Sequence, residues 1–363
     1  MRKAMLGLLL LVLFASCSKD DTNDNPKIPN TNDEGVEVSF SSGVVTSILT
    51  TTTFTRGPIV SAIPMGHSVG VYGIPAMLDD PSSYTMQSRI NEENFQQYLF
   101  NAKYEVIGVN GNKGTLKQVN SPKFPSNQSG MDALAFYAYY PFASNPVYDE
   151  AGGYKVPVKL ETADMSQTYD YLYTGQIMSG ITSDPIPLIF NHALFRVQFR
   201  LFSDKSEILD YPVEVTSIVI KANESADGYM FLANGLTKPA STALTSYSYP
   251  LSNLEITHVE NTDPETIKYS VTPVADFLFM GGSSISTITC TLKDKKNGER
   301  DYEIYNRVLT SEAQRIKLEK GKIVCVNVLY TPRDANLSSA VNTWQVSTTT
   351  YDYKINDNEN PTN

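Results

Sequence analysis

Alternating apolar and polar residues run through most of the chain and predict β-strands. In residues 193–202 every second side chain is apolar and most of the others are polar, which is typical of a strand with one buried face. Residues 133–140 are apolar on both faces and end at Pro141, as in a strand at the centre of a sheet. The same reasoning predicts strands at residues 36–40, 217–221, 286–292, 302–305 and 323–330.

Turn residues separate these segments, and helical signal is scarce. Asn297 and Gly298 lie between the strand-like segments 289–294 and 300–305, and an Asn-Gly pair in that position predicts a β-hairpin. Helix is expected at residues 91–99 at most. Many short strands over this length predict an all-β fold made of tandem antiparallel β-sandwich domains.

The length of the chain predicts two such domains. The 363 residues are too many for one typical core. A polar stretch at residues 203–211 predicts the boundary. We therefore expect an N-terminal domain at residues 36–205, a C-terminal domain at 206–345 and a tail at 346–363.

The first residues have the features of a lipoprotein signal. A basic pair, Arg2 and Lys3, precedes an apolar run at residues 4–14 that is too short to span a bilayer, and two small residues stand directly before Cys17. We predict that residues 1–16 are removed and that the Cys17 thiol carries a lipid, which anchors the chain in a membrane. The alternative is an ordinary secretory signal with an incidental cysteine.

Residues 17–35 predict a flexible tether, because they are rich in Asn, Asp, Thr and Pro and contain little to bury. The tether begins with Ser-Lys-Asp-Asp at residues 18–21, which resembles the short acidic export signal of Bacteroidetes surface lipoproteins. A solvated linker has the same composition. The resemblance predicts surface exposure on the cell outer membrane.

Net charge, hydropathy and cysteine content narrow the classes of function. The net charge is −10 and no cluster of Lys and Arg occurs, which argues against a nucleic-acid partner. No apolar run after the signal approaches the roughly 20 residues of a membrane helix, so the lipid is the only membrane anchor expected. Cys290 and Cys325 leave two interpretations open, a disulfide or two buried thiols.

Residues that carry chemistry are sparse, and the sequence predicts no enzyme, no metal site and no cofactor. The three histidines, His67, His192 and His258, lie far apart in the sequence. Of these, His192 is expected to be a hydrogen-bonded structural residue. The glycine-rich segment 108–115 lacks the spacing of a phosphate-binding loop and predicts a hairpin turn.

Tyrosine is abundant, with 22 residues, and aromatic faces stack on sugar rings. Most of the tyrosines lie in apolar strand-like runs, where core packing explains them. Tyr169, Tyr171 and Tyr173 alternate along one segment and are the candidate platform for a glycan ligand.

A set of short motifs, spread from the signal to the C-terminus, resembles the fimbrillin family of Bacteroidales. Thr55 and Arg56 follow the first predicted strand, and Trp344 lies near the end of the chain. Between them, in the expected order, come residues 69–72, 136–141, 170–173, 189–197 and 320–324.

The resemblance implies a fold and a function. Fimbrillins are subunits of surface fimbriae that consist of two transthyretin-like β-sandwich domains, are exported as lipoproteins and polymerise after proteolysis. It places the processing site after Arg56, so that residues 36–56 form a removable leader strand and Gly57 begins the mature subunit. The alternative interpretation is a surface lipoprotein that never polymerises, such as a fimbrial anchor or a tip adhesin that binds glycan or a host protein. Arg56 is then an exposed loop residue of no consequence.

Polymerisation of this kind predicts strand exchange with other fimbrial subunits. Residues 36–40 and 44–49 are expected to pair within the first domain of the precursor and to leave an open edge after cleavage. The donor expected to fill that edge is the C-terminal tail, where apolar and aromatic side chains alternate with polar ones: Trp344, Val346, Tyr351 and Tyr353. The alternative is that residues 344–355 form the final strand of their own second domain.

Overall fold

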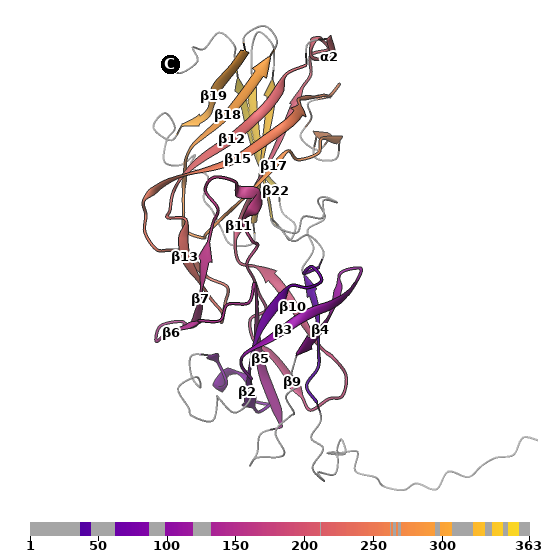
Figure 1. The fold of residues 1–363 in the computed structure, drawn as a ribbon, viewed down its shortest axis with the longest axis vertical. Helices are drawn as coiled ribbons and strands as arrows, with labels where there is room; N and C mark the ends of the chain where they lie inside the picture. Colours follow the sequence, from indigo (N-terminus) through magenta and orange to yellow (C-terminus); the bar gives the residue numbers. More distant parts are fainter. Residues whose placement is uncertain are drawn as a thin grey trace, which may run out of the picture. The chain divides into compact units, whose positions relative to one another are not determined.

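The computed structural model describes most of the chain after residue 36 (Figure 1). The described residues are 37–44, 62–86, 99–118, 132–210, 212–261, 263, 266–267, 270–294, 298–306, 322–330, 336–343 and 348–355. Their regular structure is almost entirely β-strand, which confirms the all-β fold. Short helices occur at η1 (Pro81–Ser83), η3 (Met165–Gln167) and α2 (Glu207–Asp210). No helix in this described part has the length and hydropathy needed to cross a bilayer.

The first sheet closes on itself around a core of its own. Its strands follow the order β2 (Ser68–Ala76), β3 (Leu99–Asn110), β4 (Lys113–Gln118), β1 (Phe40–Val44), β10 (Ile186–His192), β8 (Leu172–Tyr173), β5 (Ala133–Tyr140) and β9 (Ile177–Gly180). An added pairing between β2 and β5 closes the ring and leaves β9 outside it. Side chains from β1, β2, β3, β4, β5, β8 and β10 share one buried apolar cluster.

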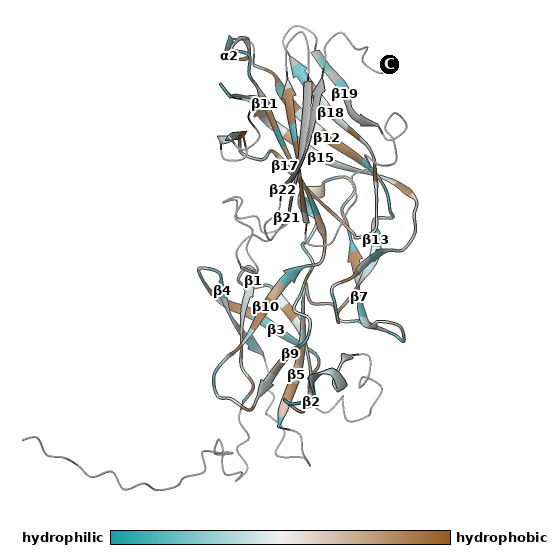
Figure 2. Ribbon diagram, turned by 180° about the vertical axis from the view of Figure 1, so that it is seen from behind, coloured by the Kyte–Doolittle hydropathy of each residue, from teal (hydrophilic) through white to brown (hydrophobic). Residues whose placement is uncertain are grey.

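β5 is the strand that the sequence predicts most directly. All eight of its residues are buried, as expected of a segment that is apolar on both faces. Figure 2 shows β5 as mostly hydrophobic. The predicted helix at residues 91–99 is not confirmed: Leu99 begins β3, and residues 91–98 lie outside the described part of the chain.

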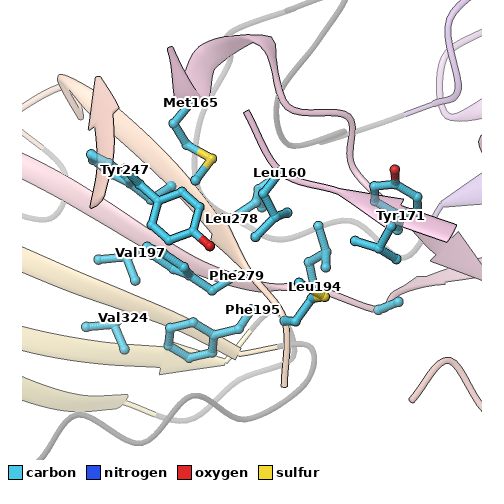
Figure 3. Close-up of a cluster of buried hydrophobic side chains, with 14 of the residues drawn as sticks. Leu160, Met165, Tyr171, Leu194, Phe195, Val197, Tyr247, Leu278, Phe279 and Val324 are labelled. Atoms are coloured by element: carbon cyan, nitrogen blue, oxygen red, sulfur yellow. The ribbon is translucent and has the colours of Figure 1, made fainter. Parts of the chain in front are cut away.

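Two further sheets share a second core. One has the order β16 (Thr257–His258), β11 (Phe195–Ser203), β20 (Lys322–Tyr330), β21 (Asn336–Thr343) and β22 (Thr348–Ile355), and β17 (Ala275–Phe279) also pairs with β11. The other has the order β15 (Leu244–Glu255), β12 (Glu214–Asn223), β18 (Ile285–Asp294) and β19 (Gly298–Asn306). Figure 3 shows Phe195 and Val197 of β11 close to Val324 of β20, with Phe279 and Tyr247 beside them.

The fourth sheet is small and has the order β14 (Thr237–Pro239), β13 (Asp227–Phe231), β7 (Gly153–Lys159) and β6 (Val147–Asp149). Val156 and Val158 of β7 and Met230 of β13 join the second core. The ring of Tyr154 in β7 stacks on Tyr72 of β2, with centroids 5.2 Å apart.

The expectation of purely antiparallel sheets is wrong. β1 pairs in parallel with β10, and β11 pairs in parallel with both β16 and β20. Parallel neighbours need a long crossover connection, and here several other strands separate the partners in sequence. Alternation within a single strand contains no information about the direction of its partner.

The expectation that β11 has one exposed polar face is also wrong. All nine residues of β11 are buried, including Arg196, Gln198 and Arg200. Arg196 forms two hydrogen bonds to the carboxylate of Asp276, from Nε (2.7 Å) and from Nη2 (2.8 Å). Arg200 Nη2 donates to Gln198 Oε1 at 2.7 Å. These polar side chains are buried because they satisfy one another and Asp276.

Three other sequence-based predictions concern the hairpin at Asn297 and Gly298, the two cysteines and the domain boundary. β18 and β19 form an antiparallel pair, as the hairpin at Asn297 and Gly298 requires, with residues 295–297 outside the described part of the chain. Cys290 and Cys325 are two buried thiols and do not form a disulfide. The domain boundary expected at residues 203–211 would come directly after β11. All the ladders of β11, however, are formed with strands that come after that boundary, namely β16, β17 and β20.

Candidate functional site

β1 fills a position between β4 and β10 in the first sheet and pairs with both strands. Phe40 lies opposite Leu116 in an antiparallel ladder and opposite Ile186 in a parallel one. The Ser39 carbonyl accepts a hydrogen bond from the Ile186 amide at 2.9 Å. We call the space that β1 occupies the β1 slot.

One face of this segment is almost completely buried in the slot. The side chains that point inward are each no more than 4% exposed: Val38, Phe40, Ser42 and Val44. Phe40 contacts the rings of Tyr104 and Phe136 edge-on, with centroid distances of 5.1 Å to each. Phe40 is therefore the main apolar anchor of the segment.

The local sequence explains both the strand and its register. The predicted strand at residues 36–40 is displaced, because β1 spans Phe40–Val44, but Val38 and Phe40 keep the predicted alternation and Ser42 and Val44 continue it. A slip of one residue would turn this set toward the opposite face. Of the second expected segment, 44–49, only Val44 lies among the described residues.

Two positions of β1 are held in close contact with the neighbouring strands. Ser42 lies opposite Gly114, and a Cβ on Gly114 would collide with the Ser42 Oγ. A Cβ on Gly43 would lie 3.3 Å from Cδ1 of Ile189, so alanine would fit there if that methyl group moved by a few tenths of an ångström. The inward position is the more restrictive, because Ser42 is buried and a Cβ on Gly114 would also lie 3.3 Å from Cγ1 of Val106.

Loss of β1 would expose both backbone and apolar surface. Burial of a Val or Phe side chain contributes about 1.5–3 kcal/mol, and Val38, Phe40 and Val44 all lie in the slot. β4 and β10 would each be left with an unpaired edge. Such edges accept an added strand through main-chain hydrogen bonds.

Comparison with known proteins identifies the family. The Fimbrillin-like family profile matches residues 61–356. The chain belongs to the fimbrillin-like family. This confirms the resemblance that the sequence motifs indicate. No curated protein matches this chain.

The chain is also similar to several solved structures. A candidate cell adhesion protein from Bacteroides uniformis shares 13% identity with a TM-score of 0.52, over 85% of this chain and 98% of that one. A fimbrial protein from Bacteroides vulgatus shares 12% identity with a TM-score of 0.46, over 88% and 99% of the two chains. A fimbrial assembly protein from Parabacteroides distasonis shares 10% identity with a TM-score of 0.42, over 87% and 100%.

The sequence-predicted site residues of this fimbrillin-like chain fall into two groups. Those outside the described part of the chain are Cys17, Arg56, Gly57, Trp344 and Val346. Tyr351 and Tyr353 lie in β22, opposite Val326 and Val328 of β20 in a parallel ladder. β22 also pairs with β21, so the described part of the tail lies in a sheet of its own chain.

Two of the three histidines of the fimbrillin-like chain form side-chain contacts of a structural kind. His192 Nδ1 lies 2.8 Å from Asp170 Oδ2 and both side chains are buried, which confirms the hydrogen-bonded structural role. His67 Nδ1 lies 2.7 Å from the Tyr140 hydroxyl. The described residues contain no group of His, Cys, Asp and Glu that could hold a metal ion.

The candidate sugar platform is not an exposed surface. Tyr171 is only 6% exposed and belongs to the second core, and its hydroxyl accepts a hydrogen bond from the Lys159 amide at 3.0 Å. Tyr169 and Tyr173 are partly buried against the same core. Alternation alone does not distinguish a ligand platform from a strand whose aromatic face packs inward.

Sequence reasoning missed the residues that shape the β1 slot. Gly114 of β4 lies in the segment 108–115 that predicts a hairpin turn, and Ile189 of β10 begins the family motif 189–197, but the sequence assigns neither residue a role in holding a strand. The one signal available is the run of small residues at Ser41, Ser42 and Gly43, which is unusual within a strand that is otherwise apolar on its inner face.

Glu224 is a buried carboxyl group directly after β12. Its side chain is 0% exposed, and its Oε2 accepts hydrogen bonds from the Met280 amide at 3.2 Å and from the Ser283 hydroxyl. Burial raises the pKa of Glu224 from 4.5 to about 8 in spite of these bonds, which favour the charged form.

We expect Glu224→Gln to reduce the pH dependence of stability. Because the pKa of Glu224 is higher in the folded state than the ordinary value of 4.5, folding is favoured by protonation, and stability falls as pH rises from 4.5 to about 8. The slope reaches about 1.4 kcal/mol per pH unit at most. Urea unfolding at several pH values between 4.5 and about 8 measures this slope. Substitution of the exposed Glu255 by Gln is the matched control. Equal slopes in the wild type and Glu224→Gln would contradict this assignment.

Proposed function

We propose that this chain is a structural subunit of cell-surface fimbriae that serve adhesion and biofilm formation. The observation that carries the proposal is the position of β1: a strand that precedes Arg56 fills the slot between β4 and β10 and covers the core of the first sheet. Membership of the fimbrillin-like family supports a fimbrial or adhesive role at the cell surface and a non-enzymatic one. Other fimbrial subunits are the partners.

Assembly in this proposal begins with removal of the leader. Cleavage between Arg56 and Gly57 separates β1 from the rest of the chain, and the slot is left with two unpaired strand edges. A strand from another subunit then pairs with β4 and β10 in place of β1. The donor comes from the C-terminal residues, where the sequence favours Trp344, Val346, Tyr351 and Tyr353.

The C-terminal strands are suited to donation by their place in the sheet. β20 pairs with β11 along one edge, while β21 and β22 share its other edge. Departure of β21 and β22 therefore leaves the ladder between β11 and β20 intact. This arrangement supports a donor that is exchanged without unfolding the second core.

Two tandem transthyretin-like domains complete the proposal for the fold, with a boundary earlier than the sequence-based one between residues 205 and 206. The ladders of β11 favour a division just before Phe195, which would assign β11 to the C-terminal domain. Residues 1–16 form the signal peptide and residues 17–35 the tether. A lipid on Cys17 attaches the precursor to the outer membrane.

We expect Arg56→Ala to block polymer formation while the precursor still folds and reaches the surface. Without cleavage β1 keeps the slot occupied. Electron microscopy of cells measures polymer formation, and the N-terminal sequence of sheared fimbriae measures cleavage. Thr55→Ala is the neighbouring control. Normal fimbriae from Arg56→Ala chains would show that assembly does not require cleavage at this site.

We expect Cys17→Ala to abolish surface display, because the thiol that accepts the lipid is absent. Antibody labelling of intact cells measures display, and unprocessed precursor should accumulate. Ser18→Ala keeps the thiol and should be displayed normally. Normal labelling of the Cys17→Ala chain would show an ordinary secretory signal.

A further inference from the structure

The inward face of β1 contains one polar side chain, that of Ser42. Ser42 lies between Phe40 and Val44 on this face and is 3% exposed. Its Oγ is buried and has no hydrogen-bond partner among the residues that the structure describes. Buried polar groups are normally hydrogen-bonded, because burial removes their bonds to water. Ser42 therefore makes the binding of β1 in the slot less favourable.

The surroundings of Ser42 explain why its hydroxyl is unsatisfied. In the two ladders Ser42 lies opposite Gly114 of β4 and Leu188 of β10, and neither has a polar side chain. A Cβ on Gly114 would collide with the Ser42 Oγ and would lie 3.3 Å from Cγ1 of Val106. The hydroxyl thus lies among apolar side chains and glycine, and alanine at position 42 would remove it without adding bulk.

A second unsatisfied hydroxyl lies beside β1, on Tyr104 of β3. Tyr104 is 2% exposed, and its hydroxyl has no hydrogen-bond partner in the described part of the chain. Burial raises the pKa of Tyr104, so the hydroxyl keeps its proton and lacks an acceptor for it. Because Phe40 packs against this ring, departure of β1 would expose the ring and let water reach the hydroxyl.

Three other buried tyrosines of the first sheet, all in β5, have hydrogen-bond partners. Their hydroxyls each lie within 3.0 Å of a partner atom: Met86 N for Tyr137, Asn101 Oδ1 for Tyr139 and His67 Nδ1 for Tyr140. The unsatisfied hydroxyls of Ser42 and Tyr104, in contrast, lie where β1 meets the slot.

We infer that the unsatisfied hydroxyls of Ser42 and Tyr104 control how fast the leader leaves the slot once the chain has been cut. The inference rests on the proposed function and assigns a regulatory role at the same site. Two ladders and three apolar side chains hold the leader, and cleavage between residues 56 and 57 removes none of these contacts. Release lets both hydroxyls regain hydrogen bonds to water, which makes departure more favourable.

The same penalty has little effect before cleavage. The leader is then part of the chain that contains the slot, so its effective concentration at the slot is high and β1 stays bound. Cleavage ends this covalent advantage, and the buried hydroxyls then shorten the time for which the leader remains in the slot. The two hydroxyls therefore couple cleavage to opening of the slot.

The rate of leader release tests the inference. The precursor without its signal carries a fluorophore on Cys17, and a protease recognition sequence inserted between Arg56 and Gly57 limits cleavage to that junction. Gel filtration at successive times after cleavage separates the released leader from the bound one. The native Cys290 and Cys325 are buried and stay unlabelled.

We expect Ser42→Ala to slow release about tenfold, which corresponds to about 1.4 kcal/mol. Ser41→Ala is the matched control, because it removes a hydroxyl from the neighbouring, partly exposed position and should leave the rate within about twofold of the wild type. Equal or faster release from Ser42→Ala would overturn the inference, since it would show that the hydroxyl is satisfied in solution.

Tyr104→Phe tests the contact from the side of the slot. This change keeps the ring against Phe40 and removes only the hydroxyl, so release should slow by about threefold or more. Tyr140→Phe is its control, because the Tyr140 hydroxyl has a partner in His67 and its removal should not slow release. Unchanged release from Tyr104→Phe would also overturn the inference.

Failure of the inference and failure of the proposed function give different results. An unmodified chain that keeps its leader after cleavage and forms no polymer would refute the proposed function. An unmodified chain that polymerises, together with variants at Ser42 and Tyr104 that release the leader at the unmodified rate, would overturn the inference alone.

Discussion

Replacement of Asp276 by alanine is expected to lower the free energy of unfolding by about 3–5 kcal/mol, because it leaves the buried Arg196 guanidinium without its charged partner. Arg196 is 1% exposed and donates two hydrogen bonds to Asp276, at 2.7 and 2.8 Å. Burial alone lowers the pKa of Arg196, but its neighbours, foremost the Asp276 carboxylate, raise this pKa above its ordinary value. Urea unfolding of the wild type and the variant measures the loss.

The matched control is Asp149→Ala. Asp149 also pairs with a cation, Lys155, at 2.7 Å, but both side chains are partly exposed to water. Exposed ion pairs contribute about 0–1 kcal/mol. Similar losses from the two alanine variants would show that burial of the Arg196 pair has no special effect on stability.

Replacement of Phe40 by alanine is expected to destabilise the uncleaved precursor by about 3–5 kcal/mol, the usual cost of a large aromatic cavity in a core. Phe40 is 2% exposed and its ring contacts both Tyr104 and Phe136. Because this ring is the main anchor of β1, the variant should also release the leader more readily after cleavage. Urea unfolding and the retention of the leader peptide after cleavage measure the two effects.

The control for Phe40→Ala is Ser41→Ala, the next residue along the same strand. Ser41 is partly exposed and faces away from the core, so the change should stay within about 0.5 kcal/mol of the wild type. Equal effects from the two variants would contradict the burial of the inward face, and with it the role of Phe40 as an anchor.

Local periodicity determined much of the fold, because burial on one or both faces of a strand shows directly in the sequence. Ala133–Tyr140 is the clearest example: eight apolar residues that end at a proline form a fully buried strand. The order of short motifs was sufficient to indicate the family, which the match to residues 61–356 confirms. The alternation at Val38 and Phe40 also determined which face of that segment is buried.

Only the tertiary structure decided which strands are neighbours. β1 lies between β4 and β10, and β11 pairs in parallel with β20, although these partners are far apart in sequence. Alternation has a range of a few residues and carries no information on such pairings. For the same reason the polar side chains of β11 predict an exposed face, whereas Asp276, 80 residues after Arg196, allows that face to be buried. The β1 slot also depends on tertiary pairing. Gly114 and Ile189 limit the size of the side chains that fit in the slot only because β1, β4 and β10, which are distant in sequence, pair in one sheet.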